Sequence, residues 1–466
     1  MSDLDKVLAR IDAERDNSLA RLFKLLSIKS ISTDPTYADD CRTAAVTLAA
    51  DLATLDLAAE VHPTDGHPIV FAKGAAAGAG GAPGRTRAVF YGHYDVQPVD
   101  PLELWQTPPF EPRIATLPDG RKAIIARGAC DDKGQVMTFI EACRAFKAVT
   151  GALPLDLTFV IEGEEECGSK HLPAWIAAHK NEIVGDIALV CDTGMWDPRT
   201  PAITTALRGL VYEEIKVKAA DRDLHSGLFG GAAQNPIRVL ARIIAAIHDE
   251  DGRIAIPGFY DGVKELPAAV KKEWQALDLT AERFLGQIGP SVPAGERGRL
   301  VIEQISSRPT CDVNGIWGGY TGTGAKTVIP AEASAKISFR LVEGQEPAKI
   351  REAFRAFARA RLPADCKIEF TGHSGAPAVA LDWDLPQLAA ARAALTREWG
   401  TEALLIGSGG SIPVVADFKR LLGIDTLLIG FGLDDDRIHS PNEKYDLTSF
   451  HKGTRSWARI LAALAA

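Results

Sequence analysis

The chain has 466 residues, which is long for one hydrophobic core, so we expect two domains. Hydrophobic residues make up 46% of the sequence and charged residues 24%, a composition typical of a folded globular protein rather than a disordered one. The formal net charge of −9 argues against a nucleic-acid partner, which would require a basic surface.

Cysteine usage and the absence of long apolar runs bear on location. The seven cysteines are irregularly spaced and form no CxxC pair, which is typical of a reducing compartment. The first 28 residues are charged and amphipathic, unlike a secretory signal peptide. No uninterrupted run of 18 apolar residues is present, so no membrane span is expected. We therefore predict a cytoplasmic protein.

The first part of the chain alternates predicted helices and strands. Apolar residues at helical spacing predict helices at 4–28, 43–57 and 134–149. The Gly- and Ala-rich stretch 71–87 is predicted to be a flexible surface connection. Four short apolar runs, each followed by a polar turn, are predicted strands: 87–95, 122–132, 155–166 and 186–192. This alternation predicts an α/β sheet with substantial parallel character.

The sequence pattern changes near residue 208. Residues 208–220 alternate apolar and charged side chains, as a half-exposed antiparallel strand does. A helix at 235–250, two strands within 325–342 and a helix at 346–362 complete a small α+β pattern. The α/β pattern returns with a helix at 385–400 and a strand at 425–432. We predict a domain divided into residues 1–207 and 375–466, with an α+β insert at 208–374.

Acidic and imidazole side chains follow the predicted strands of the larger domain. Ligands of open α/β sheets bind outside the carboxyl ends of the strands. The residues at these ends are His93 and Asp95, Asp131 and Asp132, Glu162 to Glu166, Asp192 and, after the last apolar run, His439. Imidazole suits zinc, and carboxylates suit zinc or manganese. The pattern therefore predicts a metal site.

The number of ions depends on how many of these residues are ligands. One catalytic zinc takes three protein ligands and a water. Two ions that share a bridging carboxylate need about five protein ligands and can hold a hydroxide nucleophile between them. Cations would also explain why Glu162, Glu164, Glu165 and Glu166 lie so close together without prohibitive repulsion. One of the adjacent Glu165 and Glu166 could bind metal while the other takes a proton from the water.

Each of these residues has an ordinary explanation when taken alone. A histidine after a strand is usually a surface residue, an aspartate there is usually a turn former or helix cap, and adjacent glutamates are usually solvated. Their joint occurrence, in order, at five predicted strand ends favours the metal site.

Seven motifs together resemble the cocatalytic dizinc peptidases. They are GHYDVQP (92–98), RGACDDKG (127–134), EGEEECGS (162–169), CDTGMW (191–196), DLHSG (223–227), GGSIP (409–413) and HSPNEK (439–444). This family includes carnosinases, cytosolic non-specific dipeptidases, aminoacylases, glutamate carboxypeptidases and the deacylases of acetylornithine and succinyl-diaminopimelate. The motifs are most similar to the dipeptidase branch. The resemblance implies a mixed, mainly parallel sheet flanked by helices, with an inserted lid or dimerisation domain.

The resemblance also implies roles in the metal site. His93, Asp131 and Asp192 would bind one ion, and Asp131, Glu166 and His439 the other, so that Asp131 bridges both. Glu165 would be the general base. Asp95, two residues after His93, would orient its imidazole, and the peptide bond between Asp131 and Asp132 is expected to be cis.

Further roles are implied for the insert and the glycine-rich turn. His225 would reach across a dimer interface to the substrate carbonyl, Arg340 would bind the C-terminal carboxylate of the substrate, and Ser411 would lie in a turn that binds the same carboxylate. Cys167 departs from the Ser or Thr common in relatives. We interpret Cys167 and Cys130 as small buried packing residues rather than ligands.

These expectations describe a homodimeric metallo-dipeptidase with two divalent ions per subunit, zinc or alternatively manganese or cobalt. The alternative is an N-acyl amino acid amidohydrolase or deacylase of the same family, since the walls of the acyl pocket cannot be assigned from the sequence. A non-catalytic binding relative would have lost the base or a ligand, and neither is missing.

Overall fold

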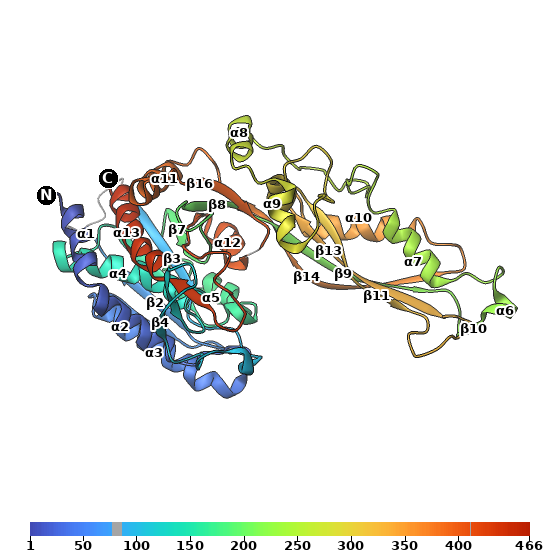
Figure 1. Ribbon diagram of the computed structural model, residues 1–466, viewed down its shortest axis with the longest axis horizontal. Coiled ribbons are helices and arrows are strands. Elements are labelled where there is room, and N and C mark those ends of the chain that lie inside the picture. Colours follow the sequence, from blue (N-terminus) through green and yellow to red (C-terminus); the bar gives the residue numbers. More distant parts are fainter. Residues whose placement is uncertain (77–85, 411) are drawn as a thin grey trace. The chain divides into compact units, whose positions relative to one another are not determined.

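The computed structural model describes residues 1–76, 86–410 and 412–466, which form two compact units (Figure 1). Unit 1 comprises Met1–Thr205, Leu381–Leu405 and Pro413–Ala466, and unit 2 comprises Ala206–Ala380 and Ile406–Ile412. Unit 2 therefore extends beyond residue 374, where the sequence analysis ends the insert. The reason is that Gly375 and Ala376 still pair with a strand of the unit 2 sheet.

The larger sheet has nine strands in the order β1-β2-β6-β3-β7-β17-β8-β15, with β16 paired to β8. Its centre, β6-β3-β7-β17, is parallel, and the strands on both sides are antiparallel. This confirms the predicted mixed sheet. The strands are β1 (Ala58–His62), β2 (Ile69–Gly74), β3 (Arg87–His93), β6 (Asp156–Glu162), β7 (Ile187–Val190), β8 (Ala202–Leu207), β15 (Val379–Ala380), β16 (Leu404–Ser408) and β17 (Asp425–Leu428).

Helices cover both faces of this sheet. Phe90 of β3 stacks on Phe139, with ring centroids 3.8 Å apart, whereas the next residue, Tyr91, meets Phe418 edge to face. Because successive side chains of a strand point to opposite faces, Phe139 and Phe418 lie on opposite sides. The helices of unit 1 are α1 (Asp3–Ala13), α2 (Arg15–Leu26), α3 (Ala38–Ala53), α4 (Lys133–Thr150), α5 (Leu172–His179), α11 (Pro386–Trp399), α12 (Pro413–Asp417), α13 (Leu447–Leu464) and the short turns η1 (Pro35–Tyr37), η2 (Leu102–Leu104), η3 (Glu165–Cys167) and η6 (Phe418–Leu422).

Two local predictions in the first 90 residues were wrong in detail. The single helix predicted at 4–28 is two helices, because Glu14 leaves the helical conformation with φ −97° and ψ 12°. The predicted connection at 71–87 begins inside β2, whose residues Val70 and Ala72 are fully buried in the core. Residues 77–85 of that stretch lie outside the described residues.

The segment that carries Asp131 does not belong to the larger sheet. The sequence analysis placed 122–132 among its strands, but β5 (Lys122–Ile125) pairs with β4 (Arg113–Thr116) and β18 (Lys444–Asp446) in a separate three-stranded sheet. Asp131 follows a loop after β5, and the next residue, Asp132, is the N-cap of α4. It is therefore placed by a loop and a helix start rather than by a strand end.

Unit 2 contains a four-stranded antiparallel sheet in the order β11-β13-β9-β14. Alternate residues of β9, such as Val211 and Ile215, are buried in a core with Leu240 of α7 and Phe354 of α10. This confirms the half-exposed strand pattern. The elements of unit 2 are β9 (Gly209–Lys218), β10 (Leu224–His225), β11 (Thr310–Gly318), β12 (Val328–Ile329), β13 (Glu332–Leu341), β14 (Lys367–Ala376), α6 (Ser226–Phe229), α7 (Pro236–Ala245), α8 (Ala268–Ala276), α9 (Ala281–Leu285), α10 (Pro347–Arg359), η4 (Gly286–Ile288) and η5 (Glu303–Ser307).

None of the helices formed by the described residues is both long enough and apolar enough to span a membrane.

Candidate metal centre

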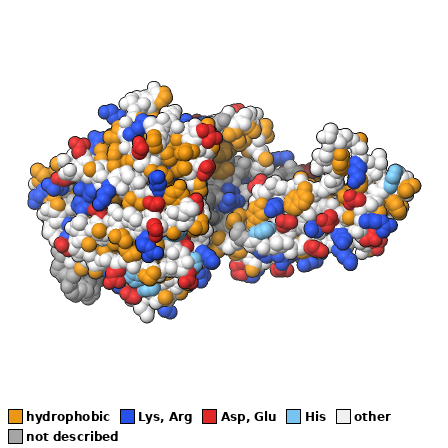
Figure 2. Space-filling view, turned by 90° about the horizontal axis from the view of Figure 1, so that it is seen from below, with side chains coloured by type: hydrophobic (Ala, Val, Ile, Leu, Met, Phe, Trp, Pro, Cys, Tyr) orange, Lys and Arg blue, Asp and Glu red, His pale blue; other side chains and the backbone are white. Residues whose placement is uncertain are grey.

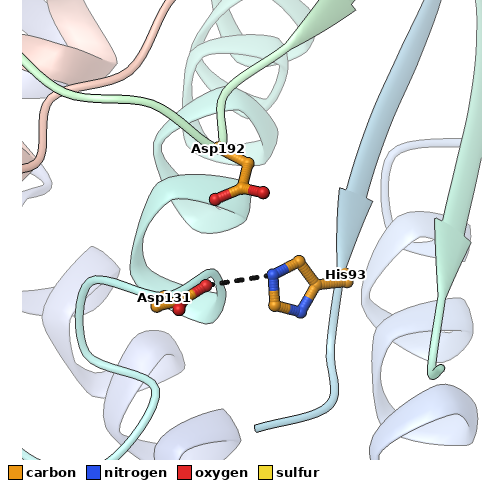
Figure 3. A group of neighbouring side chains, drawn as sticks. All are labelled: His93, Asp131 and Asp192. Carbon is orange, nitrogen blue, oxygen red and sulfur yellow. Dashed lines mark hydrogen bonds and ion pairs between the residues drawn. The ribbon is translucent and has the colours of Figure 1, made fainter. Parts of the chain in front are cut away.

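His93 ends β3 as a fully buried residue whose ring is held on both sides. Its Nε2 atom lies 3.1 Å from Oδ1 of Asp131 (Figure 3). On the opposite side of the ring, Nδ1 lies 3.1 Å from the carbonyl oxygen of Asp95 and 3.3 Å from its Oδ1. The other carboxylate oxygen of Asp95 accepts a hydrogen bond from the backbone N–H of Glu166. Asp95 thus contacts two of the implied ligands while Nε2 stays directed at Asp131.

Asp131 lies between two imidazoles. Its Oδ1 faces His93, and its Oδ2 lies 3.0 Å from Nε2 of His439, which is also 3.2 Å from Oε2 of Glu166. The peptide bond between Asp131 and Asp132 is cis, as the resemblance implies. The carboxylate of Asp132 accepts a hydrogen bond from the backbone N–H of His93.

Two groups of possible metal donors share Asp131. His93, Asp131 and Asp192 form one group, which converges from β3, the start of α4 and the end of β7 (Figure 3). Asp131, Glu166 and His439 form the other group. Within each group the donor atoms all lie within 4.8 Å of one another. Nitrogen and carboxylate donors that converge in this way suit a divalent cation.

The pKa values of these side chains are shifted because carboxylates and imidazoles are crowded together in the site. Burial raises the pKa of Asp192 well above its ordinary value, and repulsion from Asp131 and Asp132 raises it further. Burial also acts to raise the pKa of Asp131, but hydrogen bonds from His439 and His93 outweigh it and lower that pKa. Asp131 and Glu166 in turn raise the pKa of His439 to about 10. Divalent cations bound at these donors would favour the charged form of the carboxylates.

The four glutamates of residues 162–166 have different surroundings, so the expectation that the whole cluster faces cations was wrong. Glu162 is buried and accepts hydrogen bonds from Tyr91 and Ser169. Glu164 is also buried; its carboxylate lies 2.8 Å from Nδ1 of His171. Only Glu165 and Glu166, in the turn η3, remain for the metal site.

Glu165 has the ionisation expected of a group that exchanges protons near neutral pH. Burial, together with the nearby charges of Glu166, Asp131 and Asp95, raises the pKa of Glu165 to about 7 against the opposing effect of His93. A general base works best when its pKa is close to the working pH. Bound cations would lower this pKa by stabilising the carboxylate.

The other implied residues belong to unit 2 or to the glycine-rich turn. His225 is exposed and caps α6, where its Nδ1 accepts a hydrogen bond from the N–H of Gly227. Arg340 lies on β13, half-buried, and forms no ion pair with any carboxylate among the described residues. Ser411 lies outside the described residues.

Both cysteines near the site were interpreted as buried packing residues. Cys130 is buried, as expected, but Cys167 is exposed, so that prediction was wrong. The turn η3 is followed by Gly168 in a left-handed conformation, and the chain here runs at the surface. Neither cysteine belongs to a donor group formed by the described residues.

Sequence reasoning missed a residue that holds Glu166. The side chain of Gln97 donates a hydrogen bond of 2.7 Å to Oε2 of Glu166, the atom that lies near His439. Gln97 is the sixth residue of the GHYDVQP motif. Its presence in that motif was the available signal, but nothing in the sequence shows that residues 97 and 166 meet.

Comparison with known protein families and curated proteins gives matches over most of the chain. The model of peptidase family M20/M25/M40 matches residues 89–463. The Cys-Gly metallodipeptidase dug1 of Schizosaccharomyces pombe is 31% identical, with 99% of this chain and 98% of that protein covered. The Beta-Ala-His dipeptidase of Homo sapiens is 30% identical, with 99% and 93% covered.

Solved structures agree with these matches. Human carnosine dipeptidase 1 superposes with a TM-score of 0.76 at 28% identity, covering 100% of this chain and 99% of the other. A metallo-carboxypeptidase of the M20 family from Sulfolobus solfataricus gives a TM-score of 0.79 at 30% identity, covering 96% and 99%.

Proposed function

The chain belongs to peptidase family M20/M25/M40, and from this we propose that it is a metal-dependent dipeptidase that hydrolyses the peptide bond of dipeptides. One observation carries the proposal: in a chain similar over 99% of its length to a metallodipeptidase and to a dipeptidase, two groups of donors share Asp131. We propose that each group holds one divalent ion, zinc by the donor chemistry, with manganese or cobalt as the alternatives.

The proposed chemistry assigns one task to the metals and one to Glu165. Two divalent ions would lower the pKa of a shared water and polarise the scissile carbonyl. Glu165 accepts a proton from that water and returns it to the leaving amine. Asp95 holds the ring of His93, and Gln97 holds Oε2 of Glu166, so the ligands are oriented before substrate binds.

Binding of the substrate is assigned to residues outside the metal centre. Arg340 offers a guanidinium with no carboxylate partner among the described residues, which suits the free carboxylate of a dipeptide. We assign Ser411 to the same carboxylate and His225 to the oxyanion formed at the scissile carbonyl, both on the resemblance alone.

A homodimer would complete the site if His225 acts on the partner subunit. The edge strand β11 supports this proposal, because its side chains Val313, Ile316 and Trp317 are exposed apolar residues at an edge open to pairing. Leu228 of α6, the helix that His225 caps, is 77% exposed. Acidic and basic side chains are interspersed among the described residues on the face drawn in Figure 2, which gives no support to a nucleic-acid partner. All seven cysteines are free, which supports a cytoplasmic location.

A substrate panel tests the proposed function and its competitors. Purified protein is stripped with a chelator, reloaded with zinc, manganese or cobalt, and offered free dipeptides, N-acyl amino acids and longer peptides with free C-termini. We expect turnover of dipeptides that requires added metal. Faster turnover of N-acyl amino acids would favour the deacylase alternative, and faster release of C-terminal residues from long peptides would favour a carboxypeptidase. Metal-independent turnover would contradict the proposal.

A further inference from the structure

The last residues of the HSPNEK motif are not explained by metal binding, since only His439 belongs to a donor group. Glu443, four residues after His439, is fully buried. A buried carboxylate is costly unless several donors satisfy it. Its hydrogen bonds therefore indicate what the residue does.

Four donors converge on the carboxylate of Glu443. Oε2 accepts hydrogen bonds from Nη1 of Arg127 at 2.8 Å and from the backbone N–H of Gly128 at 2.9 Å. Oε1 accepts from the backbone N–H groups of Cys130 at 2.9 Å and of Asp131 at 3.1 Å. All four donors come from the short segment that ends at the shared aspartate.

The backbone of Glu443 is tied to the same region. Its carbonyl oxygen accepts from the N–H of Ala126, and the next residue, Lys444, pairs with Ile125 of β5. The neighbouring Asn442 binds a different segment: its side chain accepts from the N–H of Gln106 and donates to the carbonyl of Leu104. Hydrogen bonds to two different segments of the chain therefore hold the end of the motif in place.

The segment around His439, just before these anchors, has an unusual backbone. Arg437, His439 and Asn442 have positive φ values of 55°, 61° and 63°, a conformation that non-glycine residues rarely adopt. Such conformations persist only where surrounding contacts impose them. The bonds of Glu443 and Asn442 are contacts of this kind, and they lie within four residues of His439.

We propose that Glu443 is a positioning residue of the metal centre, which fixes Asp131 and His439 relative to one another. The inference rests on the proposed metal site and extends it to a residue that touches neither metal nor substrate. The carboxylate of Glu443 accepts hydrogen bonds from the backbone N–H groups of Cys130 and Asp131 and so orients the peptide group of Asp131. The hydrogen bonds of Asn442 hold the loop that carries His439. Both groups must hold their positions for Oδ2 of Asp131 and Nε2 of His439 to serve one ion.

The variant Glu443→Gln tests this role, because an amide keeps the shape of the side chain but replaces one acceptor oxygen with an NH₂ donor. At least one pair of N–H groups in the Arg127–Asp131 segment would then lose its acceptor. Cobalt affinity is measured by competition with a chromophoric chelator, and cobalt coordination by visible absorption. We expect about 10- to 100-fold weaker binding of at least one ion, as outer hydrogen-bond partners of ligands typically contribute. Excess metal should restore part of the activity.

Glu398→Gln is the matched control. The side chain of Glu398 is 4% exposed and accepts charge-assisted hydrogen bonds from Arg455 and Arg459 on α13, so its loss also weakens a buried ion-pair network. We expect it to lower the unfolding temperature while leaving cobalt affinity and absorption as in the wild type.

The outcomes separate the positioning role from the function it serves. If the wild type binds cobalt and Glu443→Gln binds it equally well, Glu443 is only a structural residue and the inference fails while the dipeptidase proposal stands. If the wild type binds no divalent metal, both fail. Should Glu443→Gln not fold, Glu443→Asp, which keeps the charge but shortens its reach, is expected to bind cobalt more weakly than wild type, and unchanged affinity would again overturn the inference.

Discussion

The Nε2 atom of His439 lies 3.0 Å from Oδ2 of Asp131, although the two residues are 308 positions apart in the chain. The other oxygen of the same carboxylate lies 3.1 Å from Nε2 of His93. One aspartate thus joins two donor groups, whereas every other member belongs to one group only. Substitutions should therefore differ in how many ions they remove.

Asp131→Asn is expected to weaken the binding of both ions, because the carboxylate of Asp131 is common to both groups. Asp192→Asn should weaken the binding of only one ion, because Asp192 belongs to a single donor group. Metal content after dialysis, measured by inductively coupled plasma mass spectrometry, should fall from about two ions per subunit toward zero in the first variant and toward one in the second. Equal losses in the two variants would contradict the shared role of Asp131.

Glu165→Gln removes the proposed proton acceptor without changing the size of the side chain. We expect kcat to fall by about 10²- to 10⁴-fold, the usual contribution of general acid–base catalysis. Metal content should remain that of the wild type, since Glu165 belongs to neither donor group. Glu103→Gln, at an exposed position of η2, is the control and should keep full activity. A fully active Glu165→Gln variant would exclude this residue from the mechanism.

Arg340→Met tests recognition of the substrate carboxylate. Hydrogen bonds to charged groups contribute about 1.5–3 kcal/mol, so kcat/KM for a dipeptide should fall about 10- to 150-fold, mainly through KM. The wild type should discriminate strongly against the corresponding dipeptide amide, and the variant should not. Lys336→Met removes a cation from the same strand, one paired with Glu214, and should preserve the discrimination. If Arg340→Met still prefers the free carboxylate, another group binds it.

Mixing two inactive variants tests whether His225 acts on the partner subunit. A heterodimer of His225→Ala and Glu165→Gln would contain one site with both residues intact. Random assortment after partial denaturation and refolding should therefore restore about a quarter of wild-type activity, because half of the dimers are mixed and each has one intact site. Refolding each variant alone is the control. Without recovery in verified heterodimers, His225 would have to act within its own subunit or not at all.

Glu162 should make stability depend on pH. Burial raises its pKa from 4.5 to about 8, with repulsion from Asp95 and Glu165 adding to the shift and hydrogen bonds from Tyr91 and Ser169 opposing it. Between these pH values the folded protein keeps a proton that the unfolded chain has released. The stabilisation relative to an uncharged side chain is therefore complete below about pH 4.5 and lost as the pH rises through about 8.

Glu162→Gln removes this dependence while keeping an acceptor for Tyr91 and Ser169. From pH 5 to pH 9, the free energy of unfolding of wild type relative to this variant should fall by a few kcal/mol, on the order of the shift in pKa. Chemical denaturation of the metal-free protein measures it, since bound cations would alter neighbouring charges. A pH-independent difference between the two proteins would show that the carboxyl of Glu162 has the same pKa in the folded and unfolded states.

Regular elements could be predicted where local pattern and packing agree. Residues 208–220 alternate apolar and polar side chains, and β9 buries alternate residues as that pattern requires. The predicted helix 385–400 is α11, which begins at Pro386 and ends before Gly400. The strand β2 was missed because its partner β6 is distant in the sequence, and the split at Glu14 was missed because the helical spacing of apolar residues continues across it.

Within the site, residue types could be predicted but their arrangement could not. The joint pattern of imidazoles and carboxylates after apolar runs includes His93, Asp131, Asp192 and His439 among its candidates, and the resemblance to the dizinc peptidases selects these four as ligands. The pattern could not divide the glutamates of residues 162–166, since Tyr91 and His171 remove Glu162 and Glu164 from the site through contacts made only in the folded chain.

By itself, the sequence determined the fold class, the family and the side chains available for catalysis, because these depend on residue type, spacing and motif. Only the tertiary structure decided that Asp131 arrives from a loop beside a separate small sheet, and that Glu443 holds that loop. The physical reason is that a buried carboxylate accepts hydrogen bonds from whichever N–H groups folding brings to it, and their identity is not encoded in its neighbours along the chain.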